Sequence, residues 1–250
     1  NVPRQNAVLV VEVDGNEVGR FNLLPTAMGS IRQDVTINLG AASQPDAKTG
    51  VISARNYYQR SEERQQVFDK ASAAAKDKKP DNAIQQFRKI IETDAKDFVA
   101  WTELGTLLFR AEKFADAEKA YGEALKLKPD FEVALLNLGK LHMSQKQPEK
   151  AVPVLAKAVE VDGNSADANH YLGEALLQTK RGSLAVGFLN DAIRLAPIEK
   201  AEIHLRLAAL YNGAGMKDKA AAEFKQFLSK VPNYKEKATL EKYIADNSPK

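Results

Sequence analysis

The sequence predicts an α+β fold, mostly α, in which a solenoid of paired helices follows a small N-terminal antiparallel β segment. Three observations support this prediction. A pattern of about 34 residues recurs along most of the chain, residues 1–39 contain apolar runs of strand length, and residues 40–50 have the Gly, Ser, Pro and Asp content of a linker. We therefore place a β segment at 1–39, a linker at 40–58 and a helical region from residue 59 onward.

The β segment is predicted from a turn signal between apolar runs. Asp14-Gly15-Asn16 separates two such runs, and apolar and polar residues alternate in a third run over 31–39. Two or three strands with an uncovered edge are marginally stable alone, and a bare edge accepts another strand. The apolar residues that we consider for an assembly contact are Val8, Val10, Val11, Val13, Phe21, Ile31, Val35 and Ile37.

Three explanations can complete this sheet. It can pack on the first helical unit of the same chain, it can be completed by sequence that precedes Asn1, or it can take a strand from another copy of the chain. Strand exchange between opposite ends of neighbouring copies makes a heterologous contact, and a heterologous contact that does not close builds a filament. The sequence leaves these three alternatives open.

Five copies of one pattern form the helical region. We place the units at 64–97, 98–131, 132–165, 166–199 and 201–234, followed by a capping helix and tail at 235–250. Each unit has a small residue at a fixed place in its first helix and another in its second helix, and these let the paired helices approach closely. A large apolar residue four positions after the small residue of the second helix fills the adjacent space between the helices. The small residues are Ala71, Gly105, Gly139, Gly173 and Ala208 in the first helices, and Ala83, Ala117, Ala151, Ala185 and Ala220 in the second.

This pattern resembles the tetratricopeptide repeat (TPR). The second unit fits the motif of that family at Trp101, Leu104, Gly105, Ala117, Tyr121, Ala124 and Pro129. The resemblance implies a right-handed superhelix whose concave face is lined mainly by the first helices and holds peptides or partner proteins. The N-terminal segment resembles the end of a carboxypeptidase-regulatory-like or transthyretin-like β-sandwich module, as found before such repeats in exported bacterial proteins.

The family's geometry also implies which side chains face the groove. The candidates are Thr102, Thr106, Arg110, Lys140, Met143, His170, Glu174 and Glu202. Asp167, Glu174 and Glu202 predict an acidic end of this groove. Some members of the family grip a C-terminal carboxylate with a Lys and Asn pair, and this chain has other residues at the corresponding places.

The composition argues against several classes of function. With no Cys and three His residues that form no i, i+4 pair, we predict no metal site. The chain has no nucleophile turn and no Gly-rich phosphate loop, so we predict no enzymatic activity and no cofactor. A net charge of +3 argues against a nucleic-acid partner, and no apolar run is long enough to span a membrane. The first residue is Asn, so either an N-terminal segment has been removed or the sequence is incomplete; we expect the first, an exported protein, periplasmic or extracellular, that has lost a signal peptide.

Two functions from different classes remain, and both depend on protein partners. The chain can be a structural subunit that associates with itself, as a homo-oligomer or filament, through the N-terminal strands and the solenoid ends. Alternatively, it can be an adaptor that binds a peptide or partner protein in its groove. Val10→Asp is expected to abolish assembly in the first case, and Lys140→Glu is expected to abolish partner binding in the second.

Overall fold

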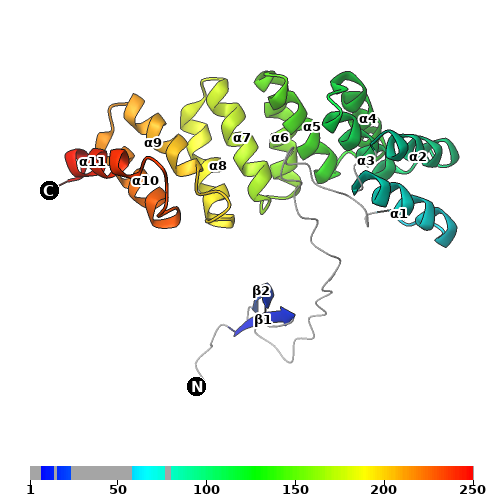
Figure 1. Cartoon of the computed structure of the whole chain (residues 1–250), viewed down its shortest axis with the longest axis horizontal. Helices are drawn as coiled ribbons and strands as arrows, with labels where there is room; N and C mark the ends of the chain where they lie inside the picture. The colour runs from blue at the N-terminus through cyan, green and yellow to red at the C-terminus, as the bar shows by residue number, and fades with distance from the viewer. Residues whose placement is uncertain (1–6, 14–15, 24–57, 77–79, 250) are drawn as a thin grey trace, which may run out of the picture. The chain divides into compact units, whose positions relative to one another are not determined.

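The structure is a computed structural model that describes residues 7–13, 16–23, 58–76 and 80–249. The chain divides into two units, Asn1–Ala42 and Ser43–Lys250, each with its own internal contacts. The first unit contains strands, and the second contains helices (Figure 1).

The described part of the first unit is a two-stranded antiparallel sheet. β1 (Ala7–Val13) pairs with β2 (Asn16–Leu23), with Ala7 opposite Leu23 and an irregularity in the ladder between Val11 and Glu12. Of the residues considered for assembly, Val8, Val10, Val11 and Val13 lie on β1 and Phe21 lies on β2. Ile31, Val35 and Ile37, with the third predicted strand and most of the predicted linker, lie outside the described residues.

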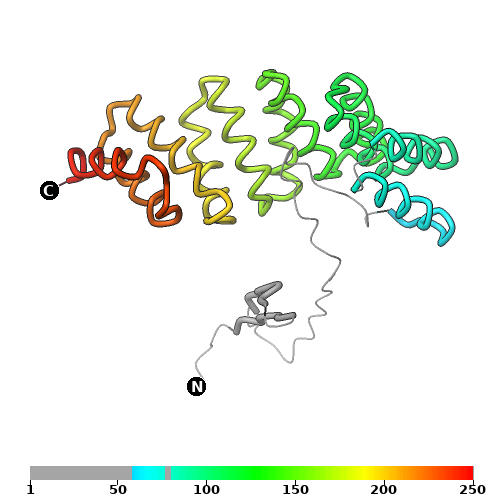
Figure 2. Tube along the Cα trace, in the orientation of Figure 1, coloured from blue at the N-terminus to red at the C-terminus, as the bar shows by residue number. Residues whose placement is uncertain are grey.

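Eleven helices make up the described part of the second unit, and they follow one another in chain order along the stack (Figures 1 and 2). They are α1 (Glu62–Lys76), α2 (Pro80–Thr93), α3 (Phe98–Arg110), α4 (Phe114–Leu127), α5 (Glu132–Ser144), α6 (Pro148–Val161), α7 (Ala166–Gln178), α8 (Gly182–Leu195), α9 (Ile203–Gly213), α10 (Lys217–Lys230) and α11 (Lys237–Asn247). Each odd-numbered helix from α1 to α9 packs on the helix that follows it, and α11 packs on α10. The helical part is therefore an all-α solenoid of five helix pairs with a closing helix.

Close packing within each pair explains the small residues of the repeat. A Cβ atom at Gly105 would lie 2.8 Å from Tyr121 Cδ1, and one at Gly173 would lie 2.6 Å from Leu189 Cδ2. Both distances are shorter than carbon atoms tolerate, so any side chain at these positions would force the helices apart. Tyr121 and Leu189 are fully buried, which confirms that a large apolar group fills the space beside each glycine.

The first helix of a pair ends in the same way in successive units. Glu112, Lys146 and Lys180 have φ near +60°, and Gly215 takes the equivalent place with φ +76°. In the second unit, Lys113 N–H donates to Leu108 O at 2.9 Å across this residue, a pattern typical of a helix that stops at a left-handed residue. This turn sends the chain back along the first helix and allows the two helices to form a hairpin.

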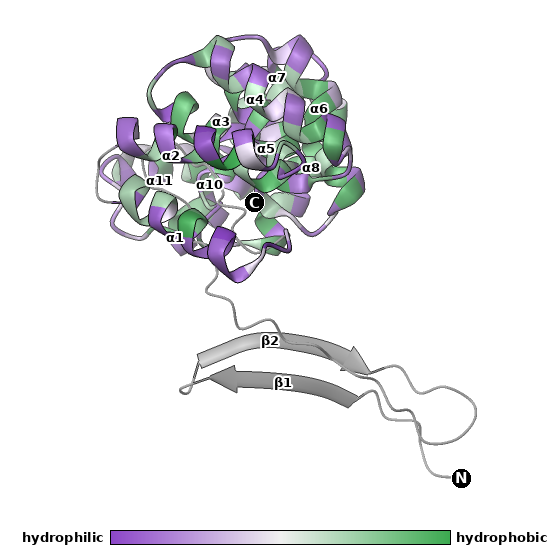
Figure 3. Ribbon diagram, turned by 90° about the vertical axis from the view of Figure 1, so that its right-hand side faces the viewer, coloured by the Kyte–Doolittle hydropathy of each residue, from purple (hydrophilic) through white to green (hydrophobic). Residues whose placement is uncertain are grey.

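Apolar residues fill the space between the paired helices in two adjoining clusters, one over α1–α5 and one over α5–α9. The helices carry hydrophobic and hydrophilic residues on different faces (Figure 3). Among the described residues, none of the helices combines the length and the apolar character that crossing a membrane requires.

Both ends of the solenoid are closed by additional contacts. Before α1, the Arg60 guanidinium makes a paired hydrogen bond with Asp97, with Nε–Oδ2 at 2.6 Å and Nη2–Oδ1 at 2.7 Å. After α10, Tyr243 of α11 packs edge-to-face on Phe224 with ring centroids 5.1 Å apart. These contacts join the first and last helix pairs of the described chain to the segments that flank them.

Candidate functional site

A pocket of about 460 Å³ lies where the first helices of three successive units meet. The end of α3 contributes Phe109, α5 contributes Lys140 and Met143, and α7 contributes Tyr171 and Glu174, among others. We call this cavity the first-helix pocket. Its volume is in the range of small ligand sites, and it combines aromatic, thioether and charged side chains. A second hollow of about 450 Å³ lies beside the turn at 179–181 and contains none of the residues predicted to face the groove.

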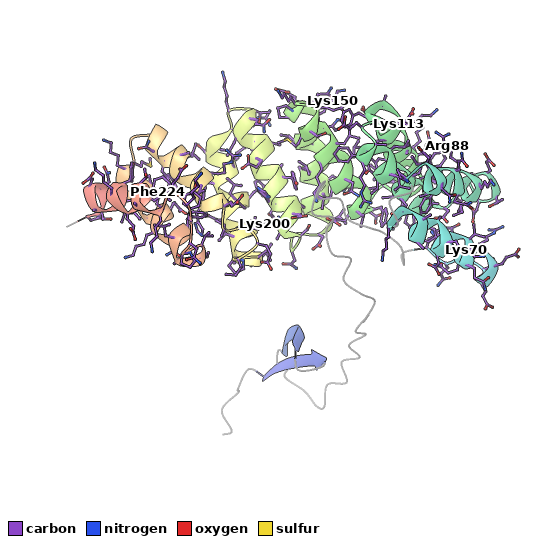
Figure 4. The ribbon with its side chains drawn as sticks, in the orientation of Figure 1. Lys70, Arg88, Lys113, Lys150, Lys200 and Phe224 are labelled. Atoms are coloured by element: carbon purple, nitrogen blue, oxygen red, sulfur yellow. The ribbon has the colours of Figure 1, made fainter. Side chains whose placement is uncertain are left out.

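The connection between α8 and α9 closes one side of the first-helix pocket. It supplies Glu199, Lys200 and Glu202, and the start of α9 supplies Ile203 and Arg206. Lys200 N–H donates to Ala196 O at 2.9 Å, and Ile203 N–H donates to Lys200 O at 3.0 Å, so the connection winds as a compact turn. Figure 4 labels Lys200, which belongs to this connection.

Asp167, at the start of α7, binds two lysines. Lys140 Nζ lies 2.8 Å from Asp167 Oδ2, and the Lys200 ammonium binds the other carboxylate oxygen. The Lys140 ammonium also lies 4.8 Å from the centre of the Tyr171 ring, within range of a cation–π interaction. Burial alone would raise the pKa of Asp167, but the two lysines outweigh it and hold this pKa at about 2.

This ion network requires a correction to the predicted acidic end. Asp167 is neutralised by Lys140 and Lys200, and Glu174 Oε1 lies 3.3 Å from Arg206 Nε. Burial lowers the pKa of Lys140 more than Asp167 raises it, so this buried ammonium depends on its partner. Two of the three carboxylates on which the prediction rested are therefore partners in ion pairs, and Glu202 remains at the rim.

A polar contact fixes the entry of α7 into the site. The Ser165 side chain accepts from Ala168 N–H at 3.3 Å as an N-cap, and its hydroxyl donates to Glu132 Oε1 at 3.1 Å. The cap sets the first turn of α7, and the second bond ties that turn to the start of α5. The start of α7, which carries Asp167, is thereby held against the start of α5.

His170 presents a neutral imidazole to the pocket. Burial, and then the positive charge of Lys200, lower the pKa of His170 to about 4. Its Nδ1 atom is buried and makes no hydrogen bond within the part of the chain that the structure describes. A neutral imidazole has one donor and one acceptor nitrogen, so His170 can hydrogen-bond to a ligand with either role according to its tautomer.

The structure brings five of the eight groove candidates together. Lys140, Met143, His170, Glu174 and Glu202 all line the first-helix pocket.

The other three candidates lie elsewhere. Thr102 and Thr106 are buried, with Thr102 Oγ1 donating to Phe98 O at 2.8 Å and Thr106 Oγ1 3.2 Å from the Tyr121 hydroxyl. Arg110, at the end of α3, is half-buried and does not line the pocket. The Thr102 hydroxyl is therefore satisfied within α3, and the Thr106 hydroxyl is satisfied by Tyr121 of α4.

Sequence reasoning did not select Tyr171, Glu199, Lys200 and Arg206 for the site. One signal for Lys200 was present, since the fifth unit begins 35 residues after the fourth, whereas the preceding units are 34 apart. Lys200 is the residue that falls between the units placed at 166–199 and 201–234. An inserted residue at a repeat boundary indicates that the connection there differs from the others, but the spacing does not show where the inserted side chain lies.

The other two histidines are structural. His142 is 4% exposed and His204 is 6% exposed, and His204 Nδ1 lies 2.6 Å from Glu223 Oε2. Within the described residues, no group of three His, Asp or Glu side chains is arranged to hold a metal ion.

Comparison with known families identifies the helical part. The family described as the middle TPR-like domain of cilia and flagella-associated protein 70 matches residues 74–232. The chain belongs to this family of TPR-like domains. Such domains bind proteins and peptides and are typically non-catalytic, and the chain is a TPR protein–protein interaction domain on this basis.

Individual relatives cover limited parts of the chain or are distant in sequence. The E3 ubiquitin-protein ligase CHIP of Arabidopsis thaliana is 36% identical over 93 residues, which cover 37% of this chain and 34% of that protein. The crystal structure of MamA has a TM-score of 0.62 at 21% identity, covering 68% of this chain and 96% of MamA. YrrB, described as a TPR protein with an unusual peptide-binding site, has a TM-score of 0.61 at 19% identity, covering 70% and 90%.

These similarities support the fold and no more. The chain spans about a third or less of the length of the curated relatives it matches. The structural neighbours share the TPR-like solenoid at identities too low to carry over a ligand. The activities and partners of the whole relatives therefore do not transfer by similarity.

Proposed function

We propose that this TPR-like domain binds an extended segment of a partner protein on the face formed by its first helices, with one side chain of that segment in the first-helix pocket. The observation that carries the proposal is the pocket itself, where α5, α7 and the start of α9 bring apolar and polar groups together. Phe109, Met143 and Tyr171 offer apolar contact, and Met is common on surfaces that bind peptides.

Polar groups on the same surface suit a peptide backbone. An extended segment has unpaired N–H and C=O groups that require partners when it is bound. Ser144, His170 and Gln178 line the pocket, and each has a side-chain donor or acceptor there. YrrB, which shares the fold, is described as having a peptide-binding site, and this agrees with the proposal.

Selection of random peptides displayed on phage, with the full chain as bait, tests this function. A matched pair of variants then locates the binding site. Met143→Glu places a carboxylate in the first-helix pocket, whereas Met216→Glu makes the same change beside α10, where the methionine is 44% exposed. We expect peptides selected on the unchanged protein to lose most of their affinity for Met143→Glu and to bind Met216→Glu normally.

Thermal unfolding of both variants controls for loss of fold. Ser144→Glu, at an exposed position on the pocket rim, gives a second test that does not disturb the core. Selected peptides that bind all three variants equally well would contradict the proposed site. Failure to select any peptide would contradict peptide binding itself.

Self-association is a second candidate function, and the hairpin favours it. β1 and β2 form a sheet of two strands, and within the described residues no third strand pairs with either outer edge. An unpaired strand edge is a template for another strand. We infer that a strand from another copy of the chain pairs with this edge.

A further inference from the structure

Some charged groups of the first-helix pocket already have an ion-pair partner within the chain, and others do not. Lys140 is 3% exposed and binds Asp167, Lys200 binds the same carboxylate, and Arg206 pairs with Glu174. The two lysines therefore share one carboxylate of α7, whereas Arg206, whose side chain is 66% exposed, lies 3.3 Å from Glu174 Oε1 without a hydrogen bond to that oxygen. An incoming anion would have to compete with Asp167 for the two lysines, which are mostly buried, so that the charge–charge interactions are strong there.

The carboxylates of the α8–α9 connection are in the opposite situation. Glu199 and Glu202 line the pocket and are exposed, and no ion pair joins either of them to another residue in the described part of the chain. With Asp167 and Glu174 included, four carboxylates stand against three cations at this site. The charge that remains available to a ligand is therefore negative.

Uncharged groups of the pocket also suit a cation. Phe109 provides an aromatic ring, whose face attracts ammonium and guanidinium groups, whereas the Tyr171 ring already lies 4.8 Å from the Lys140 ammonium. His170 stays neutral near pH 7 because burial and Lys200 lower its pKa to about 4, so it adds no positive charge. Its Nδ1 atom is buried and makes no hydrogen bond to another described residue.

We propose that the first-helix pocket receives a basic side chain, lysine or arginine, of the bound partner segment. The long apolar stem of such a side chain packs beside Met143 and Tyr171 while its charged end approaches Glu199 and Glu202. This inference rests on the proposed function and specifies the chemistry of the ligand. An acidic side chain is disfavoured, because it would meet the two unpaired carboxylates at the rim.

Fluorescence polarisation with four sets of labelled short peptides tests the inference on the full chain. The sets share mixed, uncharged flanking residues and differ only in a fixed central residue, which is arginine, lysine, glutamine or glutamate. Both ends are blocked, so terminal charges do not contribute. We expect the arginine and lysine sets to bind about tenfold more tightly than the glutamine set, with the glutamate set weakest.

A pair of double variants assigns any such preference to the pocket. Glu199→Lys with Glu202→Lys reverses two charges at the rim, and Glu92→Lys with Glu160→Lys makes the same change in net charge on exposed residues of α2 and α6. We expect the preference for basic peptides to disappear in the first double variant and to persist in the second. All four substitutions are at exposed positions, so the fold is expected to be retained.

The outcomes distinguish this inference from the proposed function. Equal binding of all four sets, abolished by Met143→Glu, would contradict the preference for a basic side chain and leave peptide binding intact. Tighter binding of the glutamate set, or a basic preference that survives Glu199→Lys with Glu202→Lys, would also overturn the inference. If none of the four sets binds, both the inference and the proposed function are wrong.

Discussion

Gly173 determines how closely α7 and α8 approach. A Cβ atom at this position would lie 2.6 Å from both Cγ and Cδ2 of Leu189, and Leu189 is fully buried. A fully buried side chain in a close-packed interior has little room to move away. The same geometry recurs at Gly105 against Tyr121, so the helix spacing depends on single missing side chains.

Gly173→Ala is predicted to destabilise the domain by up to about 2 kcal/mol. Overpacking of the α7–α8 contact costs about 1–3 kcal/mol, which equals or exceeds the gain of about 1 kcal/mol from replacing glycine within a helix. Gly187→Ala, in α8 of the same unit, is the matched control, because nothing lies within 4 Å of a Cβ atom there. Urea unfolding is expected to show this control stabilised by about 0.5–1 kcal/mol. Equal effects of the two substitutions would contradict the packing account.

Asp167 makes stability depend on pH. Its folded pKa of about 2 lies below the ordinary value of an aspartate, so its contribution is fully present above about pH 5 and is lost as the pH falls toward 2. Asp167→Asn is predicted to lose roughly 2–4 kcal/mol at pH 7, because two lysines remain without their carboxylate. Urea unfolding at a series of pH values measures both the loss and the slope.

Asp130→Asn is the control for this pH prediction. Asp130 pairs with Lys128 on the surface, so its substitution should change stability little at pH 7. The difference in stability between the unchanged protein and Asp167→Asn should shrink between pH 5 and pH 2. A difference that stays constant over this range would show that Asp167 is not the titrating group.

At the scale of elements, the segment before α1 closes the first unit. Arg60 and Asp97 form a buried pair in which each side chain is 1% exposed, and the guanidinium lies 3.7 Å from the centre of the Phe68 ring. Asp97 is also the N-cap of α3, where its side chain accepts from Ala100 N–H at 2.9 Å. One carboxylate therefore links the segment before α1 to the start of the second unit.

Arg60→Ala is predicted to destabilise the N-terminal units by about 3–5 kcal/mol, because it leaves the Asp97 carboxylate buried without its partner. Arg64→Ala is the control, since Arg64 pairs with Asp94 while its own side chain is 52% exposed. We expect that control to lose at most about 1 kcal/mol. Hydrogen exchange should show the loss of protection in α1–α3. A loss spread evenly to α9 and α10 would indicate that the stack unfolds as one unit.

The helices could be predicted from the sequence, but the site could be predicted only in part. The repeat places Gly105, Gly139 and Gly173 in register, and close helix pairs follow from this spacing. Met143 and His170 could be assigned to the groove because every unit presents equivalent positions on its first helix. The contribution of Lys200 could not be predicted, because it depends on how one inserted residue winds the connection after α8.

The charge of the site could not be predicted for a related reason. Asp167 and Glu174 lie on one helix, whereas Lys140, Lys200 and Arg206 come from α5, the connection and α9. Pairing among these groups depends on distances between elements that lie apart in the sequence. The acidic residues Asp167, Glu174 and Glu202 predicted an acidic end, but the sequence did not show that the first two pair with cations while Glu202, among the described residues, stays unpaired at the rim.

At the scale of the whole molecule, the main contacts between helices of the stack join neighbouring helix pairs. Stability in such an array is approximately a sum of unit and interface contributions, so the two ends unfold more readily than the centre. The first-helix pocket is formed by inner units and the start of the fifth, so it lies on the more stable part of the stack. We therefore expect the pocket to be formed before a ligand binds.

Val10→Asp tests whether the hairpin mediates self-association. Val10 lies on β1 opposite Arg20 of β2. If an edge of this hairpin pairs with another copy, light scattering across a dilution series should show oligomers of the unchanged protein that are lost in this variant. Val161→Asp, on α6 at a residue that is 38% exposed, makes the same change in the helical unit and should not alter assembly. A monomer at every concentration would contradict self-association.

The central claim is that a partner segment binds in the first-helix pocket. The chain has three methionines, and a protein labelled with ¹³C at its methionine methyl groups should give three resolved signals that substitution to leucine can assign. Met143 lines the pocket, Met216 lies beside α10, and Met28 lies outside the described residues. Titration with a peptide selected on the unchanged protein is predicted to shift the Met143 signal and leave the Met216 signal in place. A titration that shifts Met216 or Met28 while Met143 stays unchanged would contradict the account.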